Sequence, residues 1–339
     1  MISKTIICPN CKTQMTVQGN PGEKIYVTCS NCKKKGYFIM PIHKTESDSI
    51  SIKISGLTKI YKDVRAVDNI SFNVHNGEIY GFLGPNGAGK TTTIKAMLGL
   101  IHVNSGTIKI NGFDMNKDNI KAKEKIGYLP EKVSFYENLT PIQTLNFFCE
   151  LRSVDKSVVP SLIKEVGLED AMNRKVGTFS KGMVQLLGIA QAMIGNPSIY
   201  ILDEPTVGLD ARWVRYIREK IKMLNEHGAT VIFSSHILSE VDKVCDRIGI
   251  IRNGNLVALE DVEALKEKMG KIIKVKIKEK PEKFNGPENL KIKNGWIEFV
   301  TNDDIDYWIK MLSKYTILDL VINEFSLEDI FIHYYEGQT

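Results

Sequence analysis

The segment GPNGAGKT, at residues 84–91, has the residue types and spacing of a phosphate-binding loop, G-x-x-x-x-G-K-[ST]. An apolar segment, EIYGFL, precedes it, and a segment with helical character, TTTIKAMLGL, follows it. Glycines let backbone N–H groups converge on phosphate oxygens, Lys90 adds a positive charge near the β and γ phosphates, and the Thr91 hydroxyl can ligate Mg²⁺. The candidate nucleotide-binding residues here are Gly84, Asn86, Gly87, Gly89, Lys90, Thr91 and Thr92.

Two further apolar segments end in side chains that could act on bound phosphates. SIYILDE, at residues 198–204, ends in two carboxylates, so Asp203 could hold Mg²⁺ and Glu204 could polarise the attacking water. TVIFSS ends directly before His236, which places an imidazole on the same rim of the expected sheet. The candidate catalytic residues are therefore Glu204, His236 and Lys90, and the candidate Mg²⁺ ligands are Thr91 and Asp203.

Four cysteines near the start of the chain form two C-x-x-C pairs separated by seventeen residues. This spacing is typical of a Zn²⁺ site, in which each pair presents two thiolates to one tetrahedral ion. Bound metal would also let a short segment fold with little apolar core. An iron–sulfur cluster or a redox-active dithiol pair stays open as an alternative. The candidate Zn²⁺ ligands are Cys8, Cys11, Cys29 and Cys32.

The remaining cysteines, Cys149 and Cys245, have a different setting. Both lie in apolar patterns with helical spacing, so they are expected to be buried and inert thiols in helices.

The elements that position these residues divide the chain into several units, because 339 residues exceed what one apolar core usually organises. We expect a small cysteine module at residues 1–45, a polar linker at 46–50, a nucleotide-binding domain at 51–268 and an accessory domain at 269–339. Continuous apolar runs such as SIYILD indicate parallel strands buried on both faces. The Lys-rich alternating segments after residue 269, followed by a helical stretch, indicate an antiparallel α+β domain.

Composition excludes several classes of protein. With 43% hydrophobic and 25% charged residues, the chain is globular rather than disordered. Its longest uncharged run is interrupted by polar residues, and its start lacks a secretory signal, so we expect a cytoplasmic protein. The net charge of +5 belongs to residues 1–45, which carry +6. Nucleic acid is nevertheless disfavoured as a partner, because no aromatic residues interleave with the lysines beside Cys32.

Between the phosphate loop and SIYILDE lies FSKGM, at residues 179–183, which resembles the LSGGQ signature of ATP-binding cassette (ABC) ATPases. The order and spacing of the three motifs also resemble that family. Ser180 is a good helix N-cap for the apolar helical pattern that follows, and the N–H groups of such a helix start can bind phosphate. Ser180 and Gly182 are the matching residues, whereas Lys181 and Met183 depart from the signature.

The resemblance implies a fold and further site residues. It implies an α/β P-loop ATPase core with an antiparallel β subdomain and a helical subdomain, with ATP and Mg²⁺ as ligands. Tyr61 matches the aromatic residue that stacks on adenine, and Asp210, in GLD, matches the loop that crosses the dimer interface. Glu131 stands where the family usually has a glutamine that couples the metal and the water to the membrane subunit.

The resemblance also implies partners. In this family each ATP is closed between the phosphate loop of one copy and the signature of another, so two copies of this chain are required. Because no membrane span is expected, the moving part would be a separate integral membrane permease, with this chain bound at the cytoplasmic face.

Less specific motifs indicate which branch of the family the sequence resembles. The sequence around FSKGM, together with FSLEDIF at residues 325–331, resembles export-type ATPases, including those that accompany maturation of a copper-containing reductase. Two other functions stay open: a soluble ABC ATPase that acts on nucleic acid or ribosomes through the cysteine module, and a metal-responsive binding module with a vestigial ATPase cycle. The short spacing between Thr91 and Ser180 disfavours the former, and the intact Glu204 and His236 disfavour the latter.

Overall fold

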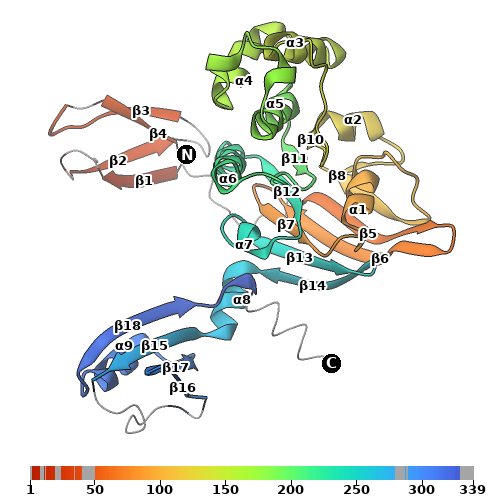
Figure 1. Ribbon diagram of the computed structural model, residues 1–339. Coiled ribbons are helices and arrows are strands. Elements are labelled where there is room, and N and C mark those ends of the chain that lie inside the picture. The colour runs from red at the N-terminus through yellow and green to blue at the C-terminus, as the bar shows by residue number, and fades with distance from the viewer. Residues whose placement is uncertain are drawn as a thin grey trace. The chain divides into compact units, whose positions relative to one another are not determined.

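The computed structural model describes residues 2–7, 11, 13–19, 24–33, 35–39, 50–278, 287 and 289–328 (Figure 1). The chain divides into two compact units, which are described separately: unit 1 comprises residues 1–79 and 91–234, and unit 2 comprises residues 80–90 and 235–339. Cys8, most of the expected linker at 46–50 and the end of FSLEDIF lie outside the described residues. The described helices include none long and apolar enough to cross a membrane.

Two short antiparallel hairpins begin the chain. The first pairs β1 (Ile2–Ile7) with β2 (Gln14–Gly19), and the second pairs β3 (Lys24–Thr28) with β4 (Lys35–Ile39). Cys11 lies in the connection of the first hairpin, and Cys29 and Cys32 lie in the connection of the second. These three cysteines therefore lie in the connections between strands.

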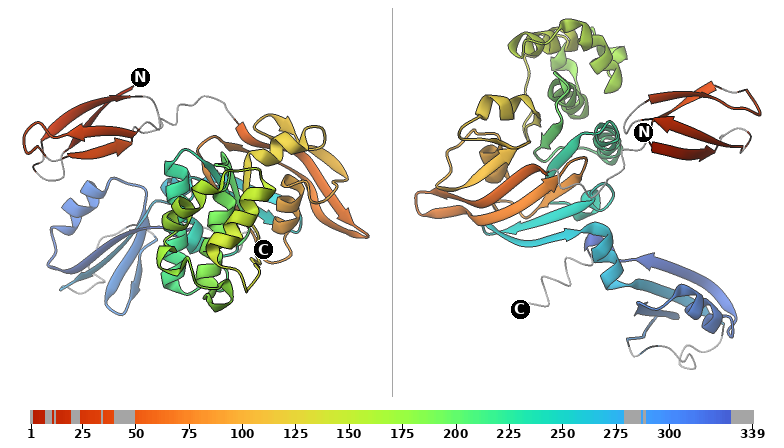
Figure 2. Two further views of the ribbon diagram at one scale, coloured as in Figure 1. Left: turned by 90° about the horizontal axis from the view of Figure 1, so that it is seen from above. Right: turned by 180° about the vertical axis from the view of Figure 1, so that it is seen from behind.

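Unit 1 contains an antiparallel sheet with the strand order β6-β5-β8-β9. Its strands are β5 (Ile50–Tyr61), β6 (Val64–His75), β8 (Ser105–Ile110) and β9 (Phe113–Asp114). β5 and β6 form the long curved hairpin drawn in orange in Figure 2. Alternating burial along them indicates that the sheet has one face in the core.

Three parallel strands in the same unit carry the candidate acids. β10 (Ile126–Leu129), β11 (Ile199–Leu202) and β12 (Thr230–Ser235) pair in that order, with Leu129 opposite Leu202 and Leu202 opposite Phe233. Every residue of β11 and β12 is buried, as expected for strands covered on both faces. Parallel pairing puts the carboxyl ends of these strands at one edge, where Asp203 and Glu204 follow β11.

Unit 1 also contains six α-helices and three short 3₁₀ turns among the described residues. α3, α4 and α5 gather at the top of Figure 1, and α3 begins with a capping box formed by Thr140 and Gln143. The α-helices are α1 (Lys90–Met97), α2 (Asn119–Glu124), α3 (Pro141–Leu151), α4 (Val159–Glu165), α5 (Lys181–Met193) and α6 (Ala211–Glu226). Short 3₁₀ turns are η1 (Lys156–Val158), η2 (Glu169–Ala171) and η3 (Val176–Thr178).

Unit 2 begins at Tyr80, within β7 (Ile79–Leu83), which leads into the phosphate loop and pairs in parallel with β13 (Arg247–Arg252). β14 (Asn255–Asp261) pairs antiparallel with β13, and α7 (Leu238–Val241) and α8 (Val262–Met269) complete this part. Cys149 is buried within α3, as expected. Cys245 is also buried, but it lies after the end of α7, so the expectation that it belongs to a helix is wrong.

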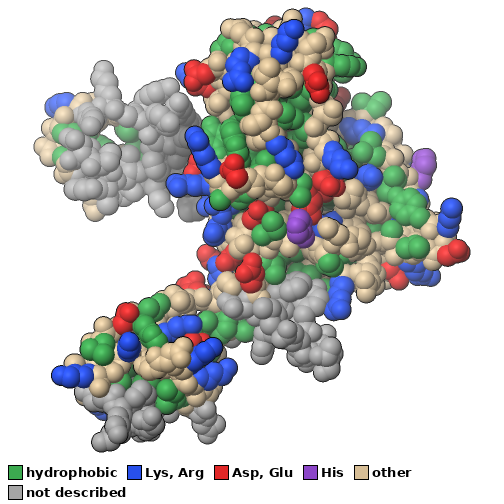
Figure 3. Space-filling view, in the orientation of Figure 1, with side chains coloured by type: hydrophobic (Ala, Val, Ile, Leu, Met, Phe, Trp, Pro, Cys, Tyr) green, Lys and Arg blue, Asp and Glu red, His purple; other side chains and the backbone are tan. Residues whose placement is uncertain are grey.

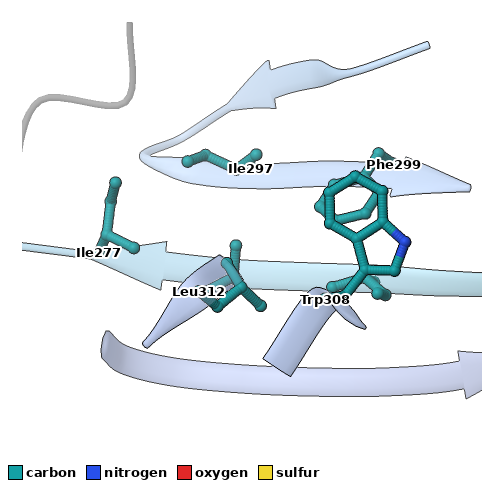
Figure 4. Packing of buried hydrophobic residues seen from close by; sticks show 7 residues of the cluster. Ile277, Ile297, Phe299, Trp308 and Leu312 are labelled. Carbon is teal, nitrogen blue, oxygen red and sulfur yellow. The ribbon is translucent and has the colours of Figure 1, made fainter. Parts of the chain in front are cut away.

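The end of unit 2 is a four-stranded antiparallel sheet with one helix, in the strand order β16-β17-β15-β18. Trp308 of the helix lies against Phe299 (Figure 4), with ring centroids 4.5 Å apart. Its Nε1 donates a hydrogen bond to the Thr301 hydroxyl. The apolar core of this part joins one face of the sheet to the helix. The elements are β15 (Lys271–Ile277), β16 (Lys291–Lys293), β17 (Trp296–Thr301), α9 (Ile305–Leu312) and β18 (Ile317–Glu324).

Charged side chains of both signs are interspersed over the face that Figure 3 shows. Among the described residues on that face, Lys and Arg therefore do not gather into one continuous basic surface.

Candidate functional site

The phosphate loop leads from β7 into α1, which begins at Lys90. The ammonium of Lys90 donates hydrogen bonds to the carbonyl oxygens of Gly84, at 2.6 Å, and Pro85, at 3.3 Å. Lys90 is only 5% exposed, so the loop is curled around its charge. A side chain at Gly84 would collide with the carbonyl oxygen of Ile251, which is why this position requires glycine.

The candidate Mg²⁺ ligands meet at the end of β11. Thr91 Oγ1 lies 3.5 Å from Asp203 Oδ1, and the same carboxylate oxygen accepts a 2.7 Å hydrogen bond from the Ser234 hydroxyl. Asp203 also donates its backbone N–H to Leu129 O, at 2.8 Å, which fixes the residue against β10. A hydroxyl and a carboxylate are oxygen donors of the kind that Mg²⁺ prefers, so the residues present fit this ion.

The electrostatics of Asp203 suit a cation site. Burial raises the pKa of the Asp203 carboxyl above its ordinary value, and hydrogen bonds from Ser234 and Thr91 lower it. The nearby carboxylates of Glu131 and Glu204 raise the pKa further. A divalent cation favours the ionised form of such an acid, so a bound Mg²⁺ would offset the effect of burial on this carboxylate.

Glu204 has an unusual backbone conformation, with φ at +48°. This left-handed region costs a non-glycine residue about 1–3 kcal/mol and is most often retained at functional sites. The Glu204 N–H donates a 2.9 Å hydrogen bond to Ser234 Oγ, and the residue is 7% exposed. The strained turn therefore holds the carboxylate in a defined place directly after Asp203.

Ser234 was not among the candidate residues, although its hydroxyl bonds both Asp203 and the Glu204 N–H. The register of β11 and β12 places it one residue beyond the pair Leu202 and Phe233. The signal in the sequence is the pair of serines that ends TVIFSS, since buried hydroxyls at a strand end need partners.

The candidate residues fall in different units. Thr91, Asp203 and Glu204 are brought together in unit 1, whereas Lys90 and His236 belong to unit 2. His236 follows β12 directly and is exposed. Of the other loop residues, Gly87 and Gly89 have φ values of +80° and +114°, Asn86 is exposed and Thr92 is half-buried.

The signature segment starts α5 with Ser180 as its N-cap, whose hydroxyl accepts a 3.3 Å hydrogen bond from Met183 N. Gly182 is buried beneath the indole of Trp213, which occupies the space that a side chain would need. Lys181, which departs from the signature, extends its side chain to Gly208. Its Nζ occupies the space that a Cβ on Gly208 would need. Sequence reasoning missed Trp213, because nothing local links it to α5.

Asp210 has a structural role in the described chain. Its carboxylate caps α6 and accepts hydrogen bonds from the N–H groups of Arg212 and Trp213, both at 3.0 Å. Trp213 thus contacts both segments. Its backbone N–H donates to Asp210 of the GLD loop, and its indole packs on Gly182 at the start of α5.

Two residues implied by the family resemblance lie on the surface. Tyr61 ends β5 with 44% of its surface exposed, and Lys59 Nζ lies 4.7 Å from its ring centroid. An exposed ring of this kind is available for stacking. Glu131 is exposed just after β10, near enough to Asp203 to affect its pKa.

Three candidate Zn²⁺ ligands come together between the N-terminal hairpins. The sulfur atoms of Cys11, Cys29 and Cys32 lie within 4.8 Å of one another, with Cys11 and Cys29 3.5 Å apart. Hydrogen bonds from the Thr13 side chain and backbone lower the pKa of Cys11 to about 6. This geometry fits a tetrahedral thiolate site that needs one more ligand, and Cys8, the fourth candidate, lies outside the described residues.

Cys29 differs from Cys11 in its protonation. Backbone hydrogen bonding from Cys32 lowers its pKa, but burial and the neighbouring thiols of Cys11 and Cys32 outweigh this and raise the pKa to about 11. A bound cation would favour the thiolate form of both side chains.

Comparison with known proteins identifies similar chains. The sequence model of the family described as ABC transporter matches residues 67–207. The bacitracin transport ATP-binding protein BcrA of Bacillus licheniformis is 40% identical over 231 residues, which cover 68% of this chain and 76% of that protein. An uncharacterized ABC transporter ATP-binding protein of Bacillus subtilis, YhcH, is 41% identical over 214 residues, covering 62% and 70%. The linearmycin resistance ATP-binding protein LnrL of Bacillus subtilis is 38% identical, covering 65% and 72%.

Solved structures of ATP-binding subunits of ABC transporters are also similar to this chain. An ATP-binding subunit of an ABC transporter superposes with a TM-score of 0.58 at 30% identity, over 64% of this chain and 92% of that one. A dimeric structure of a post-hydrolysis state of the ATP-binding cassette MJ0796, bound to ADP and Pi, gives a TM-score of 0.56 at 26% identity. It covers 62% of this chain and 98% of its own, so the rest of this chain has no counterpart in it.

Proposed function

This chain belongs to the family of ABC transporter ATP-binding proteins, and we propose that it dimerises on ATP and powers a separate membrane permease. Membership in the family makes it the ATP-hydrolysing subunit of an ABC transporter with the P-loop ABC ATPase fold. The observation that carries the proposal is the contact of Thr91 with Asp203, together with Glu204 held beside it by Ser234. The cysteine module, residues 1–45, and the accessory domain, residues 269–339, are proposed as separate folding units.

The proposed chemistry assigns one task to each residue. Mg²⁺, when bound, would neutralise charge on the β and γ phosphates. The Thr91 hydroxyl and the Asp203 carboxylate are proposed to hold the ion, and Lys90 is proposed to contact phosphate oxygens. Glu204 is proposed to accept a hydrogen bond from the attacking water and to take its proton, and His236 to contact the γ-phosphate.

The other proposed nucleotide contacts come from flanking residues. Tyr61 presents an exposed ring on which an adenine can stack. Glu131, with an exposed carboxylate near Asp203, is proposed to reach the ion through water. The backbone of the loop is proposed to bind phosphate through Gly84, Asn86, Gly87, Gly89 and Thr92.

Dimerisation follows from the number of motifs. The chain holds one phosphate loop and one signature segment, so a closed ATP site requires Ser180 and Gly182 from a second copy, along with Asp210 at the interface. The solved relative with ADP and Pi is described as dimeric, which supports this arrangement. ATP would join two copies and hydrolysis would release them, at the cytoplasmic face of the membrane beside the permease.

Transport is proposed to be of the export type. Relatives are named for bacitracin transport and linearmycin resistance, and these names support the export of compounds of this kind. The relatives named above do not mention copper, so the link to maturation of a copper-containing reductase stays a prediction from sequence.

The cysteine module is proposed to bind Zn²⁺ through Cys8, Cys11, Cys29 and Cys32. Support comes from the three thiols that the structure brings within 4.8 Å of one another. A folded metal module beside the ATPase would serve as a docking element for the permease or as a metal sensor.

Co-purification tests the transport function. A tagged Glu204→Gln chain, loaded with ATP and Mg²⁺, is isolated from gently solubilised native membranes, and its partners are identified by mass spectrometry. Glu263→Gln, an exposed acid at the start of α8, is the matched control. We expect a polytopic membrane protein in stoichiometric amounts with Glu204→Gln and less of it with the control. Recovery with ribosomes or nucleic acid and without a membrane protein would contradict the proposal.

A further inference from the structure

A cavity of about 640 Å³ lies in unit 1 at the start of β11, whereas the acids of the candidate nucleotide site follow the end of that strand. One wall comes from η1 and α4, and the other from the segment that joins α5 to β11 and from the end of α6. The buried side chains of Leu162, Met193 and Leu224 line it. The cavity can therefore enclose the apolar body of a small molecule.

Tyr200 contributes a buried hydroxyl to this cavity. The residue is only 3% exposed, and its ring lies against Gly127 of β10, where a side chain would collide with it. Within the part of the chain that the structure describes, no residue forms a hydrogen bond with the hydroxyl. Burial raises the pKa of Tyr200, and the charge of Glu165, which also lines the cavity, raises it further. A buried hydroxyl without a partner beside a carboxylate indicates a place for a ligand.

The charge of the cavity is negative. Glu165 is the acid that lines it, His227 Nδ1 lies 3.6 Å from Glu165 Oε1, and the described lining residues include no lysine or arginine. Two cations lie close by but bind backbone oxygens instead. Arg152 donates to two backbone carbonyl oxygens, and Lys220 donates to the backbone carbonyl oxygen of Glu165 rather than to its carboxylate. The Glu165 carboxylate therefore favours a cationic ligand over an anionic one.

We propose that this cavity binds a small organic amine, with its ammonium group at Glu165, Tyr200 and His227 and its apolar body between Leu162 and Met193. An ammonium group has three N–H donors. The three side chains offer a carboxylate oxygen, a hydroxyl oxygen and the nitrogen of a neutral imidazole as acceptors. The site contains none of the candidate nucleotide-binding residues, so the inference does not depend on the proposed ATPase cycle.

Three compounds that share an indole body test the preference for charge. Tryptamine is cationic, tryptophol is neutral and indole acetate is anionic. Their binding to the full-length chain is measured by isothermal titration calorimetry without nucleotide, at slightly alkaline pH, where histidine side chains are neutral. We expect tryptamine to bind about tenfold or more tightly than tryptophol, because hydrogen bonds to a charged group are stronger than neutral ones. Indole acetate should bind most weakly of the three.

Two variants test the polar end of the site. Glu165→Gln keeps the shape of the side chain and removes its charge, so tryptamine should lose its advantage over tryptophol. Glu169→Gln, an exposed acid outside the cavity, is the matched control and should bind all three compounds like wild type. Tyr200→Phe removes a hydroxyl that has no partner among the described residues, so the melting temperature should not fall, whereas tryptamine should bind about fivefold or more weakly.

Several results would overturn the inference. These are the absence of tryptamine binding to the wild-type chain at millimolar concentration, equal affinity for the three compounds, and a Glu165→Gln chain that binds tryptamine like wild type. A Tyr200→Phe chain with a lowered melting temperature and unchanged tryptamine binding would also contradict it, because the hydroxyl would then serve the fold and not a ligand.

Discussion

The nucleotide site and the cysteine cluster are both assembled from distant parts of the sequence, but they are held together differently. Asp203 and Glu204 follow a fully buried strand and share the hydroxyl of Ser234, so the sheet positions them without a ligand. Cys11 and Cys29 lie in connections of two short hairpins, and their sulfur atoms lie 3.5 Å from each other. The fold therefore preorganises the first site, whereas we propose that the second gains its order from a bound metal ion.

The largest effect is expected from Lys90→Ala, which removes the charge at the centre of the phosphate loop. ATP hydrolysis should fall by about 100-fold or more, because the positive charge near the phosphates would be lost. Phosphate release measures the rate. Lys95→Ala, an exposed lysine on the same helix, should retain wild-type activity. Equal activity of the two variants would show that the loop does not act as proposed.

Loss of one thiol should affect metal binding without affecting ATP hydrolysis. Cys29→Ser should reduce the bound Zn²⁺ from one ion per chain to a small fraction, because a tetrahedral site loses one of its four ligands. ATP hydrolysis should remain within about twofold of wild type, since the fold alone holds the nucleotide site. The control variant Cys149→Ser replaces a buried cysteine of α3, and the chain should still bind one Zn²⁺ ion at the cysteine cluster. Metal analysis and phosphate release give both readings, and coupled losses would refute the comparison.

Ser234→Ala should lower turnover and stability while the nucleotide site still binds its ligands. The substitution leaves the Glu204 N–H without its acceptor and Asp203 without one donor, so turnover should fall by about tenfold and stability by about 1–3 kcal/mol. Ser235→Ala, at the next buried position, is the control for stability, because the Ser235 hydroxyl accepts a hydrogen bond from Ile237 N. A loss of turnover that is equal in both variants would argue against a specific role for Ser234.

The smallest effect concerns the charge on Asp203 in the absence of nucleotide. Since burial raises the pKa of Asp203, the folded state loses stability as the pH rises from 3.8, the ordinary value, through the raised value. Asp203→Asn removes this penalty, so the melting temperature of the nucleotide-free chain should be a few degrees higher than that of wild type at neutral pH. The difference should disappear under acidic conditions, and stabilisation by Mg²⁺ and ATP should be lost. A melting temperature that falls at neutral pH would contradict this account.

The parts of the molecule that sequence could predict are those with a local cause. The strands that end at Leu202 and Ser235 contain continuous apolar runs, and Ser180 caps α5 because a hydroxyl precedes a helical pattern. In the same way, two C-x-x-C pairs indicate a metal site before any contact is known.

The parts that sequence could not predict depend on register and packing between segments. Ser234 reaches Asp203 only because β11 and β12 pair with Leu202 opposite Phe233. Trp213 covers Gly182 because two helices that are distant in the sequence meet at their first turns. Cys245 was misplaced for a related reason, since an apolar spacing does not show that α7 ends before it.

ATP turnover and ATP binding of Glu204→Gln, measured on the same preparation, test the central claim most directly. The claim is that the strained turn after β11 aims a carboxylate at the attacking water. We predict that ATP and Mg²⁺ still bind with wild-type affinity or better, while phosphate release falls by about 100-fold or more. Wild-type turnover in this variant would contradict the catalytic assignment of Glu204.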